Sequence, residues 1–528
     1  MVQEPLGGGV GQRYSVAPTT SDGVAAMSPR SMADLLRGLD PVTTLEAAST
    51  VLADIENNRY DAVLHRLLPR EQRSVEQWRV QMKNEGTPVA PTPVVPLAVL
   101  AATTLALGQA APEARTDSIR EQIANRLVRA ALRFNDAILG TSLRMNDDEV
   151  LAFMCRSALW RDVENEDWMI WSGELVTELS KDVRCASVLA SFRSSAGITV
   201  EEWWYRGFGE GATRAVHGAR SWGPTTGVSR RIEAGWTDLA TTPLAEAVSA
   251  AAASLVRRGS TSPPLVGNPF DLTWLTTRPV VATPDGRRFQ LWLGANNRSL
   301  LPAGLAQVIA DTSAVRYDTV AAFIGGAAER RLTAAVTVVP GTDLRIPEKM
   351  MPSSGPRCDY LIETDTTLVG IEFTIITPTR NLTAGNHQAI ADLVKRLAKK
   401  VTQIYRTFQR HDAAHAKRWL PLAVLASPSI VDPLLNERVH RVLVESNVIG
   451  GSTPSELMTC HTPEFLDLLQ YVTDTESTIV QAITAWRDST LRGTALDWWL
   501  SDRGALRCSG RARIGTIANR ARVVLACA

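Results

Sequence analysis

Two short segments joined by a polar turn constrain this chain more than any other feature. The first segment is residues 358–363 (CDYLIE), the second is residues 368–374 (LVGIEFT), and residues 364–367 (TDTT) join them. Short runs rich in β-branched and aromatic residues on either side of a polar turn predict a β-hairpin. If the turn is centred in the middle of the joining segment, Asp359 lies opposite Glu372.

The two opposed carboxylates need a physical explanation. Directly opposed residues in a hairpin are about 5 Å apart at Cβ, and like charges in that position repel each other. A divalent cation would reverse this effect, because both carboxylates would become hard oxygen ligands. The period of two along a strand places Glu372 and Thr374 on the face of Asp359, with the backbone carbonyl of Phe373 between them. We therefore expect Asp359, Glu372 and the Phe373 carbonyl to bind a metal, and the alternative is a surface hairpin with two solvated acids.

The acidic hairpin resembles the PD-(D/E)xK nuclease superfamily. In that superfamily an Asp at the start of one strand and a Glu two residues before a Lys on the next strand hold a catalytic Mg²⁺. Asp359 and Glu372 match the two acids. Residues 323–329 (FIGGAAE) resemble the helix that often contributes another acid, which makes Glu329 a further candidate metal ligand.

The resemblance extends over roughly residues 270–475 and implies a restriction-endonuclease-like α/β core with a mixed sheet. Residues 420–426 and 464–469 resemble the tail of bacterial, often defence-associated, members. The implied activity is the hydrolysis of phosphodiester bonds with Mg²⁺ or Mn²⁺, in bacterial defence or DNA processing.

The lysine of the motif is missing, because Thr374 occupies its position. The reaction needs a nucleophilic water and a cation that stabilises charge on the phosphate. In this superfamily the lysine can migrate to the following helix, where Lys395 and Lys399 are the candidate catalytic residues. The alternative is that Thr374 marks a lost active site, which would leave a nucleic-acid-binding or assembly module.

A basic segment follows the hairpin. Between residues 380 and 418 there are nine Lys or Arg and two acidic residues, in a chain with a net charge of +1. Apolar residues at helical spacing predict a helix over residues 388–408. A phosphate backbone, with DNA as the expected form, is the natural partner of such a surface, although an ordinary solvated helix face is the alternative. The residues expected to contact nucleic acid are Lys395, Lys399, Lys400, Arg406 and Arg410.

Composition limits the class of protein and its compartment. The six cysteines show no metal-binding spacing, so reduced thiols in a cytoplasm are the simplest expectation. The N-terminus has no basic segment followed by an apolar one, as a signal peptide would. The longest apolar run, residues 96–107, is too short to span a membrane, so we expect no membrane partner.

The predicted organisation is a multi-domain α plus α/β protein. A Pro-, Gly- and Ser-rich segment between residues 259 and 268 predicts the main domain boundary. Within the α/β part, the sequence predicts a hairpin formed by residues 278–283 and 288–292, a helix over 317–332 and a strand over 334–339. The predicted domains are a disordered tail (1–28), a helical domain (29–258), the nuclease-like core (268–430) and a helical C-terminal region (431–528).

Three functional hypotheses follow from the sequence. The first is a Mg²⁺-dependent nuclease with a helical domain for recognition or assembly. The second is a nucleic-acid-binding protein with a catalytically inactive nuclease fold. The third is a structural protein whose helical regions form a homo-oligomer or bind a protein partner.

Overall fold

The described part of the chain is mostly helical and contains two small mixed sheets, which agrees with the predicted α plus α/β class. The predicted disordered tail, residues 1–28, lies outside the described residues. The computed structural model describes residues 29–84, 93–110, 120–139, 151, 166–217, 228–255, 272–276, 278–291, 293–339, 344–345, 357–376, 382, 386–411, 417–450, 456–491, 496–505, 516–517 and 519–525.

The N-terminal helices pack around one apolar helix, α5 (Pro96–Gly108). Its residues from Leu97 to Leu107 are all buried, because it is apolar on every side and contacts α2, α6 and α12. Among the described helices, none is both long enough and apolar enough to cross a membrane. The other helices of this part are α1 (Pro29–Leu36), α2 (Pro41–Glu56), α3 (Tyr60–Leu64), α4 (Pro69–Asn84) and α6 (Arg120–Leu139).

The three-stranded sheet contains strands from both sides of the predicted domain boundary between residues 259 and 268. Strand β1 (Thr241–Pro243) pairs in parallel with β2 (Val280–Ala282), so one sheet contains residues from both sides of that segment. Strand β2 pairs antiparallel with β3 (Arg288–Gln290), which confirms the predicted hairpin. Helix α12 (Leu244–Leu255) contacts β1 and β2. The other helices of this part are η2 (Val183–Cys185), α8 (Glu166–Lys181), α9 (Ala186–Ala196), α10 (Val200–His217), α11 (Arg230–Ala240), α13 (Thr273–Thr276), α14 (Leu293–Leu300) and α15 (Pro302–Ser313).

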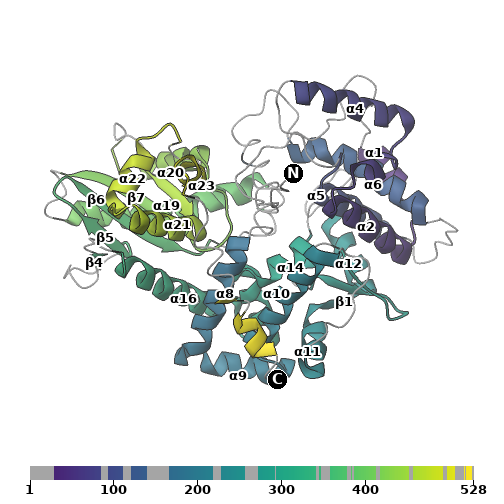
Figure 1. Ribbon diagram of the computed structural model, residues 1–528, viewed down its shortest axis with the longest axis horizontal. Helices are drawn as coiled ribbons and strands as arrows, with labels where there is room; N and C mark the ends of the chain where they lie inside the picture. Colours follow the sequence, from purple (N-terminus) through teal and green to yellow (C-terminus); the bar gives the residue numbers. More distant parts are fainter. Residues whose placement is uncertain are drawn as a thin grey trace.

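The second sheet has five strands in the order β4-β5-β6-β7-β8 and contains the acidic hairpin (Figure 1). Its first three strands are antiparallel, whereas β6, β7 and β8 are parallel. The last strand, β8, belongs to the same sheet and follows residue 430, where the predicted core ends. The strands are β4 (Leu344–Arg345), β5 (Tyr360–Glu363), β6 (Thr367–Thr374), β7 (Arg418–Leu425) and β8 (Met458–His461).

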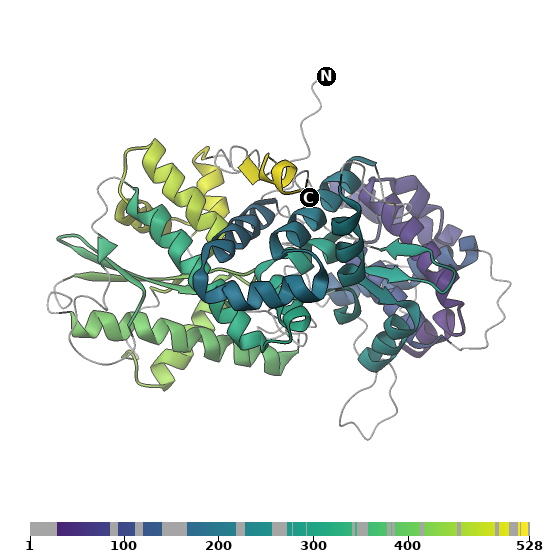
Figure 2. The same cartoon turned by 90° about the horizontal axis from the view of Figure 1, so that it is seen from below.

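Different helices cover the two faces of the five-stranded sheet. Helices α19 (His387–Arg410) and α20 (Pro433–Glu445) pack on one face, and α21 (Thr462–Asp474) and α16 (Tyr317–Thr337) lie on the other (Figure 2). The strand predicted over residues 334–339 is absent, because α16 continues to Thr337 and buries Leu332 and Val336. Helices α22 (Ile479–Arg487) and α23 (Leu496–Asp502) complete the C-terminal part.

Gly370 in β6 allows α19 to approach the sheet closely. A Cβ atom at this position would lie 2.5 Å from Ile404 Cγ2 and 2.9 Å from Phe408 Cζ. We expect Gly370→Ala to lower the free energy of unfolding by about 1–3 kcal/mol, the usual cost of overpacking a core. Urea denaturation measures this change. The matched control is Gly325→Ala in α16, whose Cβ would have its nearest neighbour at 3.8 Å, so equal losses in both variants would contradict the expectation.

Candidate functional site

The β5–β6 hairpin has the register that the sequence predicts. Tyr360 pairs with Ile371 and Glu363 pairs with Leu368. One step beyond the end of β5, the same register brings Asp359 opposite Glu372. The two acids therefore lie together on adjacent strands, on the sheet face covered by α19.

Glu372 is buried at the interface between β6 and α19. Its side chain is 1% exposed, and its Oε1 accepts a hydrogen bond of 2.8 Å from Lys400 Nζ. Its second oxygen, Oε2, is also buried and has no hydrogen-bond partner among the described residues. The alternative of a surface hairpin with two solvated acids is therefore wrong for Glu372.

Asp359 is held against the backbone of β6. Its Oδ2 accepts a hydrogen bond of 2.7 Å from Phe373 N. Since N–H and C=O of one strand residue point to the same side, the Phe373 carbonyl also lies on the Asp359 side of β6. The three predicted oxygen donors thus come from one short stretch of paired backbone.

Burial and the neighbouring acid both shift the pKa of Glu372. The pKa of the Glu372 carboxyl is raised to about 8; burial is the main cause and repulsion by Asp359 adds to it. The hydrogen bond from Lys400 lowers this pKa, but it does not offset burial. A divalent cation would favour the ionised carboxylate, because an opposite charge close to a carboxyl group lowers its pKa.

Lys400, rather than Lys395 or Lys399, reaches the acidic pair. Lys395 and Lys399 are both exposed and belong to the side of α19 that faces solvent. Lys400 lies at the edge of the buried stripe formed by Leu397 and Val401, so its side chain can extend along the sheet to Glu372. The expectation that Lys395 or Lys399 reaches the pair is therefore wrong, because the rotation of the helix about its axis turns Lys400 toward the sheet.

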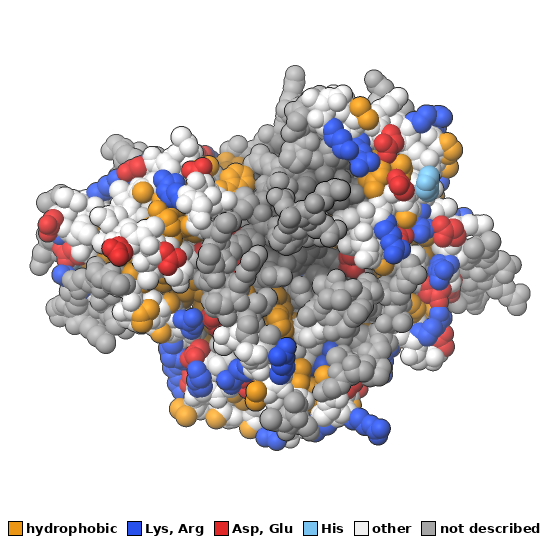
Figure 3. Space-filling view, in the orientation of Figure 1, with side chains coloured by type: hydrophobic (Ala, Val, Ile, Leu, Met, Phe, Trp, Pro, Cys, Tyr) orange, Lys and Arg blue, Asp and Glu red, His pale blue; other side chains and the backbone are white. Residues whose placement is uncertain are grey.

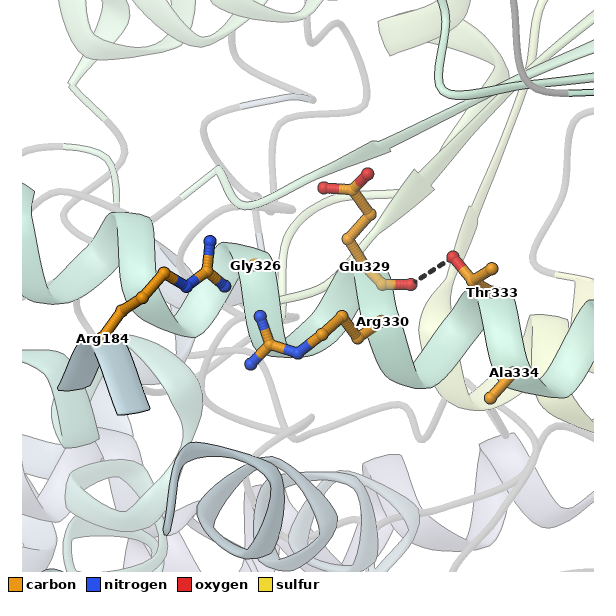
Figure 4. Close-up of a pocket in the computed structure, with 6 residues that line it drawn as sticks. All are labelled: Arg184, Gly326, Glu329, Arg330, Thr333 and Ala334. Atoms are coloured by element: carbon orange, nitrogen blue, oxygen red, sulfur yellow. Dashed lines mark hydrogen bonds between the residues drawn. The ribbon is translucent and has the colours of Figure 1, made fainter. Parts of the chain in front are cut away.

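Glu329 does not complete a three-acid group. It is exposed on α16, which lies on the sheet face opposite α19, and no three His, Cys, Asp or Glu side chains of the described residues gather as a metal site. It lines a cavity of about 500 Å³ with Arg184 and Arg330, and Figure 4 shows its carboxylate pointing away from both guanidinium groups. Repulsion by Glu329 also raises the pKa of Glu372, but less than repulsion by Asp359 does.

The outer side of α19 forms a basic surface. The helix contains six Lys or Arg and a single acidic residue, Asp392. On the molecular face seen in Figure 3, by contrast, acidic and basic side chains are interspersed over the coloured surface. The exposed cations are Lys395, Arg396, Lys399, Arg406 and Arg410, of which Arg396 is not among the predicted nucleic-acid contacts.

Two polar residues near the pair bear on its chemistry. Thr374, which replaces the motif lysine, is buried at the end of β6. Gln403 follows Lys400 by one turn, and its Oε1 is buried without a hydrogen-bond partner in the described part of the chain. The amphipathic pattern of residues 388–408 places Gln403 in a polar stripe, and no sequence signal separates it from its exposed neighbours.

The oxygen donors fit a hard divalent cation. Asp359, the unpartnered Glu372 Oε2 and the Phe373 carbonyl are the oxygen types that Mg²⁺ and Mn²⁺ prefer. No protein-family model, no curated protein and no solved structure matches this chain. The function therefore has to be inferred from the geometry of this site.

Proposed function

We propose that this chain is a divalent-metal-dependent nuclease that hydrolyses phosphodiester bonds, with its active site at the Asp359–Glu372 pair. The observation that carries the proposal is the buried Glu372 carboxylate, which binds an ammonium through one oxygen and keeps the other unpartnered. If the Glu372–Lys400 pair were only structural, a second acid opposite Glu372 would destabilise it, because the like charges of Asp359 and Glu372 repel each other.

Each residue has a distinct part in the proposed reaction. Asp359, Glu372 and the Phe373 carbonyl would hold Mg²⁺ or Mn²⁺. The bound cation supplies Lewis acidity and a water of lowered pKa. Lys400 orients the Glu372 carboxylate through Oε1, and its half-exposed ammonium can hold a phosphate oxygen or move a proton.

The chain, in this proposal, has a restriction-endonuclease-like core of the PD-(D/E)xK superfamily that it resembles. The mixed five-stranded sheet and the helix that follows the acidic hairpin support it. In this view Thr374 does not mark a lost site, because Lys400 supplies the ammonium from α19. The exposed cations of α19 are the proposed contacts for a phosphate backbone, with DNA as the expected substrate.

A nuclease assay with the full chain tests the proposal. We expect cleavage of supercoiled or linear DNA that requires Mg²⁺ or Mn²⁺ and is lost in Glu372→Ala. Single-stranded RNA, assayed in parallel, identifies the alternative substrate. Glu329→Ala is the matched control, since this acid lies outside the pair and its removal should leave cleavage nearly unchanged. If the wild type cuts no nucleic acid with either metal, the enzyme proposal is wrong.

Nucleic-acid binding without cleavage is the second candidate function. The basic side of α19 favours it, because these exposed cations would attract phosphates whether or not the acidic pair binds a metal. In that case charge removal on α19 weakens binding, while Glu372→Ala leaves binding unchanged and no cleavage is detected.

A further inference from the structure

One face of α19 contacts both segments of the hairpin beside the acidic pair. Lys400, Gln403 and Thr407 succeed one another at helical spacing and therefore share this face. Lys400 Nζ donates to Glu372 Oε1, and Thr407 Oγ1 accepts a hydrogen bond of 2.9 Å from Cys358 N. Both ends of the face thus contact residues of the pair or its neighbour, and Gln403 lies between them.

Two buried oxygen atoms of this region lack a donor. Gln403 Oε1 and Glu372 Oε2 are both buried, and neither accepts a hydrogen bond from any described residue. Buried polar atoms are nearly always paired, because leaving one unpaired costs its full desolvation penalty. Gln403 lies one turn from Lys400, which contacts Glu372, so a cation held at this interface would satisfy both acceptors.

We propose that Gln403 is a further protein ligand of the divalent cation, binding through its amide oxygen Oε1 beside Glu372 Oε2 and Asp359. This inference depends on the metal site of the proposed function and adds a ligand to it. Amide oxygens are common ligands of hard divalent cations. A neutral ligand suits this position, because two carboxylates already balance the charge of the metal.

The ligand set has a consequence for metal selectivity. With Gln403 it consists entirely of oxygen atoms, from two carboxylates, one amide and one backbone carbonyl. Oxygen-only sites favour Mg²⁺ and Mn²⁺, whereas Zn²⁺ is commonly held by His or Cys. The nearby Cys358 does not offer its sulfur for binding, since its thiol is buried and donates to the Tyr360 carbonyl.

If the side-chain amide of Gln403 has the opposite orientation, Gln403 acts as a hydrogen-bond donor and not as a metal ligand. Amide oxygen and nitrogen are distinguished by their hydrogen-bond partners, so the Gln403 side chain could also turn its Nε2 toward Glu372 Oε2. Gln403 would then donate a hydrogen bond to the carboxylate and would not touch the metal. Replacement by Glu separates the two roles, because a carboxylate can bind a cation but cannot donate to Glu372.

The test is Mn²⁺ binding to the full chain without nucleic acid, measured by electron paramagnetic resonance and calorimetry at one fixed pH for all variants, because metal affinity depends on pH. We expect Gln403→Leu to weaken Mn²⁺ binding by about 10-fold or more, in the range found when groups that support a metal site are removed. Gln403→Glu should bind Mn²⁺ at least as tightly as the wild type. Gln409→Glu makes the same charge change at an exposed position of α19 and should leave the affinity unchanged.

Each other outcome overturns the inference. Unchanged affinity in Gln403→Leu excludes Gln403 as a ligand, and weaker binding in both Gln403 variants favours the hydrogen-bond donor role. If Gln403→Leu does not fold, the nearly isosteric Gln403→Glu still decides between the two roles. A wild type that does not bind Mn²⁺ contradicts both proposals, whereas one that binds Mn²⁺ without cleaving contradicts only the nuclease.

Discussion

Replacing Lys400 with methionine is expected to lower the rate of metal-dependent DNA cleavage by about 10²- to 10⁴-fold, the usual cost of losing a positioned proton-transfer group. Lys400 Nζ is 2.8 Å from Glu372 Oε1, and the side chain is 41% exposed, so the ammonium can reach both the acid and a bound phosphate. Methionine keeps most of the side-chain volume and removes the charge. Single-turnover cleavage measures the rate of the chemical step.

Two lysines on the same helix provide controls for this expectation. Lys395 and Lys399 are exposed and would contact only the phosphate backbone. Replacing either with methionine should weaken DNA binding and reduce the slope of log K against log salt by about 0.9 for each phosphate that is no longer neutralised. Their rates at saturating DNA should stay near the wild-type value.

The comparison of the three variants decides the role of Lys400. If Lys400→Met changes only DNA affinity, Lys400 binds phosphate like its neighbours and the enzyme proposal has no proton donor. If Lys395→Met or Lys399→Met lowers the rate as much as Lys400→Met, the helix acts through its overall charge. Mn²⁺ binding by Lys400→Met shows whether the metal site itself survives the substitution.

The acidic pair could be predicted from sequence because all its determinants are local. A four-residue turn fixes the register of the hairpin, and the register alone places Asp359 opposite Glu372. The lysine requires more, since it comes from a helix whose rotation about its axis depends on packing. The buried stripe of Leu397 and Val401 indicates which side of the helix faces the sheet, and Lys400 lies directly beside this stripe whereas Lys399 does not.

Other features depend on contacts that a local pattern does not contain. Residues 334–339 have the apolar and β-branched residues of a strand, yet Val336 packs as the last buried turn of α16. The Pro- and Gly-rich segment near residue 260 has the composition of a linker, but β1 and β2 pair across it. The burial of Glu372 is also not predictable from the local sequence, because it follows from the close approach of α19 at Gly370.

The raised pKa of Glu372 gives the stability of this protein a pH dependence with a definite sign. The carboxyl titrates near its usual value of 4.5 in the unfolded chain and at about 8 in the folded one. Between these values the folded protein keeps a proton that the unfolded chain has released. The stability from this group is therefore complete below about pH 4.5 and is lost as the pH rises through 8.

Glu372→Gln should remove this pH dependence, because glutamine keeps the shape of the side chain and cannot ionise. We expect the variant to exceed the wild type in free energy of unfolding by an amount that grows from about pH 5 to about pH 9, reaching on the order of 5 kcal/mol. Urea denaturation without divalent cations measures the difference, in which the titration of all other groups largely cancels.

Adding Mg²⁺ or Mn²⁺ at about pH 9 should then stabilise the wild type and leave the variant nearly unchanged, because a cation stabilises only the form that binds it. A difference that does not vary with pH would show that Glu372 stays ionised through its bond with Lys400, and a wild type that gains nothing from either cation would remove the metal from this site.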